Sequence, residues 1–165
     1  MNFEAVIFDL DGTVITNEDE YGDAFRAVLK RLGVDTSEEY PHESGIGVEE
    51  NWPKLIKKYD IKTDKTKEEL AQETQREYFN LLNEVELQDG FIEFIEDLKA
   101  VGIRVALATS NTWNVVDKIF ASYPIEKYFD TIVTGEEVDR KKPSPDIFLK
   151  AADKLNVIPE KCVVF

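Results

Sequence analysis

The chain has 165 residues, 42% of them hydrophobic, which is enough for one folded core and a smaller second one. Its one cysteine, Cys162, excludes an intrachain disulfide framework, and the formal net charge of -14 argues against nucleic acid as a partner, because such binding neutralises phosphates with Lys and Arg. With no basic segment ahead of an apolar leader and no apolar run long enough to cross a bilayer, we expect a soluble cytoplasmic protein with no membrane partner.

The first predicted element is a buried strand that ends in two acids. An apolar run reaches Phe8, and Asp9, Asp11 and Gly12 follow it. Side chains at i and i+2 of an extended segment point the same way, roughly 6.6 Å apart along the chain, so one ligand can contact both carboxylates. The alternative is that Asp9 and Asp11 only cap a turn, for which Asp and Gly are favoured residues.

After Gly12 the chain reads as helices, and no strand returns until Ile103. Apolar residues at helical spacing predict helices over residues 19–31, 48–59 and 67–84. This stretch looks like an inserted helical domain. The charged residues between Lys57 and Glu77 are expected to form a solvated helical face.

From Asp89 onward helices and strands alternate. We expect a helix that ends at Gly102, strands at 103–108, 131–133 and 161–165, and helices at 114–122 and 144–155, which implies an α/β fold with a parallel sheet and right-handed crossovers. Ligands gather at the carboxyl ends of strands in such sheets. Asp9, Thr109 and Thr134 fall at these ends.

Two further segments carry polar groups suited to a phosphate. Thr109, Ser110 and Asn111 precede a helix, where backbone N–H groups and the helix dipole favour an anion, although the same residues also suit ordinary N-capping. Arg140, Lys141 and Lys142 form a basic, proline-rich turn, which would supply the positive centre that an acidic protein needs to hold a phosphate ester.

Together these segments resemble three motifs of the haloacid dehalogenase superfamily of phosphotransferases: Asp-x-Asp-Gly-Thr from Asp9, the hydroxyl segment at Thr109, and Lys-Pro-x-Pro-x-x-Phe from Lys142. The resemblance implies a Rossmann-like α/β core formed by residues 1–15 and 88–165. It also implies an α-helical cap of residues 16–87, as in the phosphoglycolate phosphatase and β-phosphoglucomutase group.

The resemblance also assigns roles. Asp9 would be the nucleophile, Asp11 the general acid and base, and Lys142 the cation that offsets charge on the phosphoryl group. Since the motif gives this role to Lys142, its neighbours Arg140 and Lys141 are expected to stay solvated. Thr109, Ser110 and Asn111 would bind the phosphate, while Asp9 and the main-chain carbonyl of Asp11 would hold Mg²⁺. The expected function is Mg²⁺-dependent hydrolysis of a small phosphorylated metabolite through an aspartyl phosphate.

The family's fourth motif is an acidic pair just after a strand; residues 162–165 resemble that strand, and the acids are absent from the sequence. We therefore expect a core that is shortened at its C-terminal end and a metal site that is weakened, with activity impaired.

Two alternatives stay open: a catalytically silent binding or regulatory protein, and a β-phosphoglucomutase-like isomerase. Tyr21 and Thr16 stand where mutase-like relatives have histidine and aspartate, which favours hydrolysis over the mutase alternative. His42 is either a substrate contact at the edge of the cap or a loop histidine without a functional role, which is the commoner case for a lone histidine. The oligomeric state is open.

Overall fold

The computed structural model describes residues 3–165 and divides into two compact units. The core unit comprises Met1–Thr16 and Leu87–Phe165, and the helical unit comprises Asn17–Glu86.

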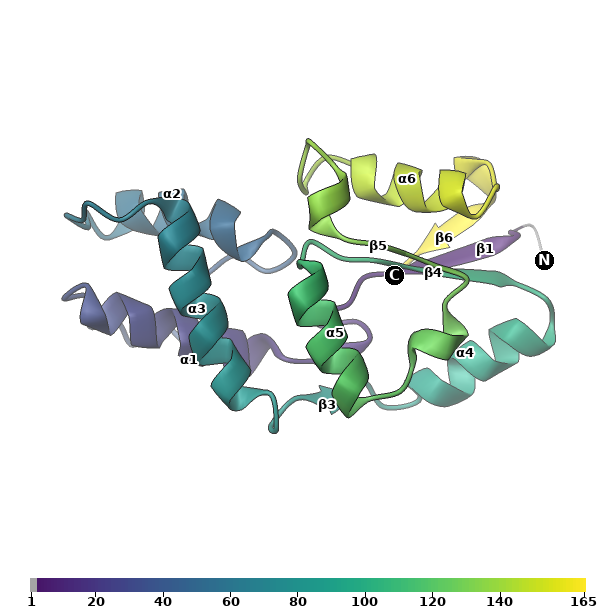
Figure 1. The fold of residues 1–165 in the computed structure, drawn as a ribbon, viewed down its shortest axis with the longest axis horizontal. Helices are drawn as coiled ribbons and strands as arrows, with labels where there is room; N and C mark the ends of the chain where they lie inside the picture. The colour runs from purple at the N-terminus through teal and green to yellow at the C-terminus, as the bar shows by residue number, and fades with distance from the viewer. Residues whose placement is uncertain (1–2) are drawn as a thin grey trace. The chain divides into compact units, whose positions relative to one another are not determined.

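The core unit is built on a parallel sheet of four strands, β1 (Ala5–Phe8), β4 (Arg104–Ala108), β5 (Thr131–Val133) and β6 (Cys162–Val164), in the order β5-β4-β1-β6 (Figure 1). All four residues of β1 are buried, as expected for the continuous apolar run of a central parallel strand. The predicted α/β class with a parallel sheet is confirmed.

Helices cover both faces of this sheet. Figure 1 shows α6 (Asp146–Lys154) on one face, and α4 (Phe91–Ala100) and α5 (Trp113–Ser122) on the other. Helix α6 packs small and branched side chains against the sheet, so the strands and the helix share one apolar layer. The layer consists of Ala5, Ile7, Ala106, Ala108, Val133, Ile147, Ala151, Ala152, Leu155 and Val157.

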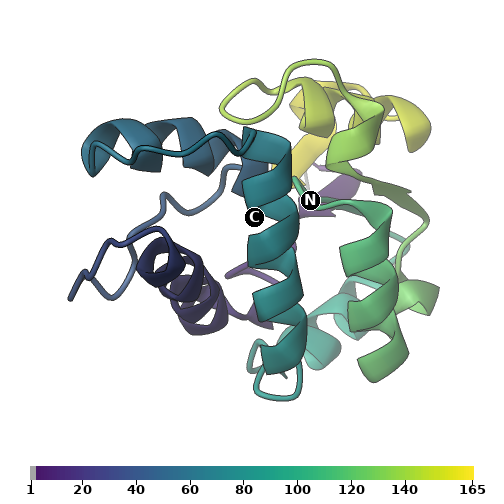
Figure 2. The same cartoon turned by 60° about the vertical axis from the view of Figure 1, so that its left-hand side comes forward.

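The helical unit consists of α1 (Glu18–Arg31), α2 (Val48–Lys58) and α3 (Lys67–Leu81), with α3 packed against both other helices. Figure 2 shows them in dark blue to teal. Aromatic side chains fill the interior: Tyr21 stacks on Tyr78 with ring centroids 4.0 Å apart, and the indole nitrogen of Trp52 donates to the hydroxyl of Thr74 at 3.1 Å. The predicted helical segment is confirmed.

The observed bounds differ little from those predicted. Helix α3 ends three residues before the expected Glu84, and α6 begins at Asp146, two residues after the expected Ser144. Proline explains the second difference, because Pro145 fixes its own φ and restricts Ser144 to extended conformations.

The small sheet of β2 (Ile15–Thr16) and β3 (Glu86–Leu87) was not predicted, since a pair of two-residue strands shows no periodicity. Three single-turn 3₁₀ helices complete the fold: η1 (Glu126–Tyr128), η2 (Gly135–Glu137) and η3 (Pro159–Lys161).

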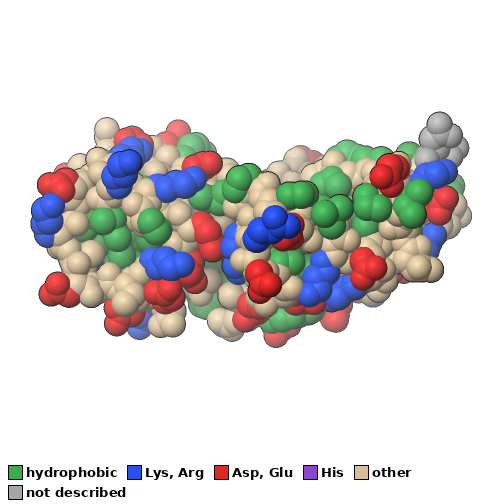
Figure 3. Space-filling model, turned by 90° about the horizontal axis from the view of Figure 1, so that it is seen from above, with side chains coloured by type: hydrophobic (Ala, Val, Ile, Leu, Met, Phe, Trp, Pro, Cys, Tyr) green, Lys and Arg blue, Asp and Glu red, His purple; other side chains and the backbone are tan. Residues whose placement is uncertain are grey.

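Surface charges of the helical unit pair with one another. Lys65 binds Glu73 at 2.5 Å, and Lys67 binds Glu49 at 2.6 Å. Basic side chains lie scattered among acidic ones on the face drawn in Figure 3. Solvent screens such pairs, so they contribute little to stability. None of the helices formed by residues 3–165 combines the length and the apolar character needed to span a bilayer.

Candidate active site

Asp9 is the first residue after β1, and its backbone and side chain are both held. Its backbone N–H donates to the carbonyl of Phe165 at 3.0 Å, which continues the β1–β6 pairing. One carboxylate oxygen, Oδ1, accepts from the N–H of Leu10 at 2.9 Å, and Oδ2 lies 2.5 Å from Nζ of Lys142. The acid and the lysine are 133 positions apart in sequence, yet they form one ion pair.

Lys142 reaches Asp9 from the turn before α6. Its side chain is 9% exposed and that of Asp9 is 17% exposed, so the pair lies largely out of solvent. The ammonium group also lies 4.9 Å from the centre of the Phe148 ring, in the range of a cation–π contact. A ring face attracts the ammonium group without cancelling its charge, so Lys142 remains a positive centre beside Asp9.

The rest of this turn is fixed by its own side chains. Arg140 binds the carboxylate of Asp146 with two hydrogen bonds, at 2.7 and 2.8 Å, and the hydroxyl of Ser144 binds it at 2.8 Å. These hydrogen bonds, led by that from Arg140, lower the pKa of Asp146. Lys141 was expected to be solvated, and this was wrong: its ammonium donates to the carbonyl of Gly135.

Asp11 lies in the tight loop after β1. Gly12 adopts a positive φ of 69°, and the carbonyl of Leu10 accepts from the N–H groups of Thr13, Val14 and Ile15. The carboxylate of Asp11 accepts a hydrogen bond of 2.7 Å from the side-chain amide of Asn111. This bond connects the end of β1 with the end of β4, across 100 positions in sequence.

The segment after β4 is buried and internally bonded. Thr109 is fully buried, and its hydroxyl accepts from the N–H of Asn111 at 3.1 Å. The hydroxyl of Ser110 is buried without a hydrogen-bond partner, so it retains its full capacity for one. Asn111 is 6% exposed. The residues that the sequence singled out around Asp9, Asp11 and Lys142 thus come together at the carboxyl ends of β1 and β4.

Glu136 is a residue that sequence reasoning missed. Its carboxylate accepts from the N–H of Trp113 at 2.8 Å, at the first residue of α5, where the hydroxyl of Thr112 makes no capping bond. Glu136 therefore accepts the hydrogen bond of a backbone N–H that we expected to bind either a phosphate or a capping side chain of the same segment. No local signal marks this role, because the acid comes from the neighbouring loop after β5.

The donor set at the end of β1 suits Mg²⁺ better than a metal that needs several protein ligands. Within residues 3–165 no group of three or more His, Cys, Asp or Glu side chains could hold a metal ion. Mg²⁺ is usually held by one or two protein oxygen ligands, completed by waters and substrate phosphate. The carboxylate of Asp9 and the main-chain carbonyl of Asp11 fit that pattern.

His42 lies inside the helical unit. Its side chain is 5% exposed and stacks on Phe25 with ring centroids 4.8 Å apart, while Nε2 lies 3.3 Å from the carboxylate of Glu18. The hydrogen bond to His42 lowers the pKa of Glu18, burial opposes this, and the hydroxyl of Ser44 adds to it. These contacts give His42 a packing role in its own unit.

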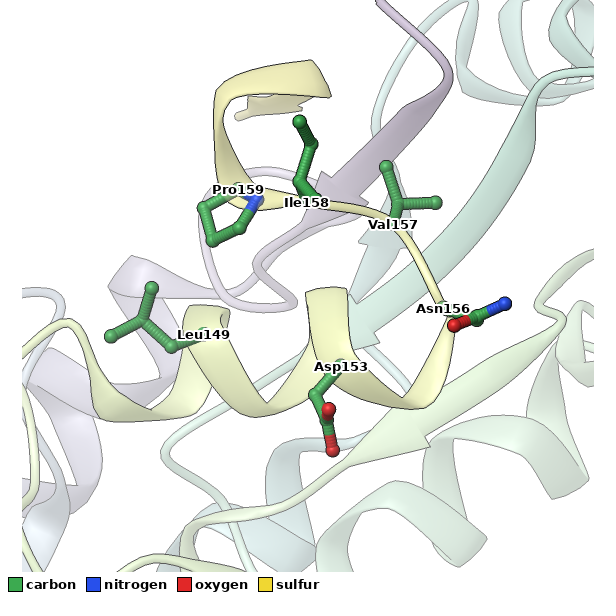
Figure 4. Close-up of a pocket in the computed structure, with 6 residues that line it drawn as sticks. All are labelled: Leu149, Asp153, Asn156, Val157, Ile158 and Pro159. Atoms are coloured by element: carbon green, nitrogen blue, oxygen red, sulfur yellow. The ribbon is translucent and has the colours of Figure 1, made fainter.

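Two hollows of the core unit contain none of the predicted site residues. One, of about 340 Å³, lies beside α6 and the segment that follows it (Figure 4). It is lined by Leu149, Asp153, Asn156, Val157, Ile158 and Pro159. A second, of about 490 Å³, lies beside α4 and β6 and is almost entirely apolar. The chemistry at Asp9 is therefore separate from both hollows.

Comparison with known proteins decides the family. The model of the haloacid dehalogenase-like hydrolases matches residues 3–165. The chain belongs to this family. Within it, the chain resembles the phosphoglycolate phosphatase, β-phosphoglucomutase and CbbY group, as the sequence motifs predicted.

Three relatives illustrate the likeness to other haloacid dehalogenase-like hydrolases. A phosphorylated carbohydrates phosphatase of Thermotoga maritima is 36% identical over 98% of this chain and 75% of its own. A phosphoglycolate phosphatase of Aquifex aeolicus is 32% identical over 96% of this chain and 73% of its own. The crystal structure of CbbY from Rhodobacter sphaeroides in complex with phosphate superimposes with a TM-score of 0.83 at 30% identity, covering 98% of this chain and 76% of that one. The chain thus spans about three quarters of the length of each.

Proposed function

We propose that this haloacid dehalogenase-like hydrolase is a Mg²⁺-dependent phosphatase that hydrolyses a small phosphate monoester through an aspartyl phosphate. The observation that carries the proposal is the contact between Nζ of Lys142 and the carboxylate of Asp9, at 2.5 Å and largely out of solvent. The contact puts a cation beside the carboxylate that would act as nucleophile, and the same cation can hold the anionic group that the nucleophile attacks.

In the first step, a carboxylate oxygen of Asp9 attacks phosphorus. The bond between phosphorus and the alcohol oxygen of the substrate breaks, and Asp11 gives its proton to that departing oxygen. The alcohol leaves, and the phosphoryl group remains on Asp9. Lys142 offsets the negative charge on the phosphoryl oxygens throughout.

In the second step, Asp11 acts as a base. It takes a proton from a water molecule as the water oxygen attacks phosphorus, and the bond between phosphorus and Asp9 breaks. Inorganic phosphate leaves, Asp9 is again a carboxylate, and Asp11 again carries its proton. When bound at the Asp9 carboxylate and the Asp11 carbonyl, Mg²⁺ supplies further stabilisation of charge on the phosphoryl oxygens.

The relatives suggest a substrate class. One is named for phosphorylated carbohydrates and another for phosphoglycolate, so both names refer to phosphorylated metabolites. We propose a phosphorylated sugar or sugar acid as the substrate. The overall negative charge of the chain makes a local cation such as Lys142 necessary for holding it.

The proposal is tested by measuring phosphate release from p-nitrophenyl phosphate, phosphoglycolate and a panel of sugar phosphates, with Mg²⁺ and with EDTA. Turnover that requires Mg²⁺ is the expected result. Binding of inorganic phosphate without turnover of any ester would favour a silent binding protein instead. Conversion of β-glucose 1-phosphate to glucose 6-phosphate without phosphate release would favour the isomerase, which Tyr21 and Thr16 disfavour.

A further inference from the structure

The side-chain amide of Asn111 contacts the carboxylate of Asp11. The amide nitrogen Nδ2 donates to Oδ2 of Asp11 at 2.7 Å. One of the two N–H groups of this amide is thus taken up by the Asp11 carboxylate and is not offered to an anionic ligand. The geometry therefore connects Asn111 with the acid–base group.

The backbone of Asn111 is held from two sides. Its N–H donates to the hydroxyl of Thr109 at 3.1 Å, and its carbonyl accepts from the N–H of Gly135 at 3.0 Å. The residue therefore joins the loop after β4 to the loop after β5. The two loops can approach this closely because residue 135 is a glycine: a Cβ at that position would overlap the carbonyl oxygen of Ser110.

A side-chain hydrogen bond that fixes the carboxylate is more important for Asp11 than for Asp9. Asp9 directly follows a buried strand, and a backbone N–H and Lys142 hold its two oxygens. Asp11 lies in a loop that turns at Gly12, so its orientation depends on what its carboxylate contacts. The hydrogen bond from Asn111 to Oδ2 favours one orientation of the Asp11 carboxylate, and proton transfer depends on that orientation.

We propose that Asn111 is a positioning residue that orients the Asp11 carboxylate for proton transfer, an inference that rests on the proposed phosphatase function. Loss of the Asn111 amide then impairs the protonation of the leaving group and leaves the binding of the phosphoryl group intact. This differs from the phosphate-binding role that the sequence motif implies for the same residue.

Dependence on the leaving group separates the two roles. Phenyl phosphates with very acidic phenols need little protonation of the leaving oxygen, whereas alkyl phosphates need it fully. For Asn111→Leu and the smaller Asn111→Ser, we expect kcat/KM to fall by about 10²-fold with an alkyl or sugar phosphate, because proton transfer is sensitive to small misplacement. With 2,4-dinitrophenyl phosphate we expect a loss of about threefold or less.

Inhibition by inorganic phosphate provides a readout that does not depend on the leaving group. Its inhibition constant is expected to stay within about twofold of wild type in both variants, because phosphate has no leaving group to protonate. Asn114→Leu is the matched control, since Asn114 is an exposed asparagine three positions further on in α5, and it should match wild type. Circular dichroism establishes that each variant is folded.

An equal loss with every leaving group, together with weaker inhibition by phosphate, would overturn the inference and return Asn111 to phosphate binding. If Asn111→Leu does not fold, Asn111→Ser decides by the same criteria. If wild type turns over none of the esters, the proposed function fails and the inference falls with it. Wild-type turnover with a uniform loss in the variants overturns the inference alone.

Discussion

Both units bury asparagine and threonine side chains, but one of those in the core unit, Asn111, has a carboxylate as its partner. Thr109 and Asn111 are buried in the core unit, and Asn51 and Thr74 are buried in the helical unit. Asn51 bonds to the backbone of Glu43 and of Gly47, and Thr74 bonds to Trp52 and Leu70, so these contacts stabilise helices and loops of one unit. In the core unit the Asn111 side chain instead contacts an acid 100 positions away.

The contrast between the contact of Asn111 and those of Asn51 and Thr74 indicates that burial alone does not identify a functional polar residue. A buried polar group must be hydrogen-bonded in either case, because leaving it unpaired costs about 1–3 kcal/mol. The informative feature is whether its partner is ordinary backbone or another group able to carry out chemistry. Substitutions in the core site should therefore change turnover, and substitutions in the helical unit should change stability.

The largest effect is expected for Asp9→Asn. The amide is a poor nucleophile, so turnover should fall by at least about 10³-fold while the fold persists. Phosphate release and circular dichroism measure the two properties. Asp117→Asn, which changes an exposed aspartate of α5, is the control. Activity close to wild type in Asp9→Asn would remove Asp9 from the mechanism.

Lys142→Met should have the next largest effect. Methionine keeps most of the length of the side chain but removes the ammonium group, which should lower kcat/KM by about 10²–10³-fold and weaken inhibition by inorganic phosphate. Steady-state kinetics with and without added phosphate test both expectations. Lys127→Met is the control, because Lys127 is exposed and remote in sequence from the motifs. Unchanged phosphate inhibition in Lys142→Met would contradict a charge-offsetting role.

In the helical unit, Asn51→Leu should reduce the free energy of unfolding by about 1–3 kcal/mol, because buried backbone groups lose their partners. The response to the leaving group, by contrast, should remain that of wild type. Urea unfolding and the substrate series described for Asn111 measure these quantities. Asn80→Leu replaces an exposed asparagine of α3 and controls for the change of residue type. A selective loss with alkyl phosphates in Asn51→Leu would break the distinction between the units.

The smallest effect concerns pH and Glu18. Its pKa lies below the ordinary value of 4.5, chiefly because of the hydrogen bond with His42, so the ionised carboxylate stabilises the folded state at higher pH. That stabilisation is complete above the ordinary pKa and is lost as the pH falls through the lower pKa of the folded protein. Glu18→Gln should therefore cost about 1 kcal/mol or less at pH 7 and almost nothing in strong acid. Urea unfolding across pH 3–7 tests this, and a difference that grows toward low pH would contradict it.

Much of the core unit could be predicted because short segments of the sequence indicate its strands and helices. The continuous apolar run before Asp9 indicated a buried strand, and the predicted bounds of β5 are those observed. Parallel strands place their carboxyl ends at one edge, which already grouped Asp9 with Thr109. The two-stranded sheet of β2 and β3 gave no such signal, because strands of two residues are too short to show a period.

Periodicity and motif spacing are properties of short segments, so the α/β class, the helical insertion and the acids and lysine of the proposed chemistry could all be predicted from the residues alone. The contacts between distant groups became known from the folded chain: Asn111 with Asp11, Glu136 with the N-terminus of α5, and Lys141 with the carbonyl of Gly135. Hydrogen bonds act over about 3 Å, and such distances between residues on different strands and loops are set by packing rather than by separation along the chain.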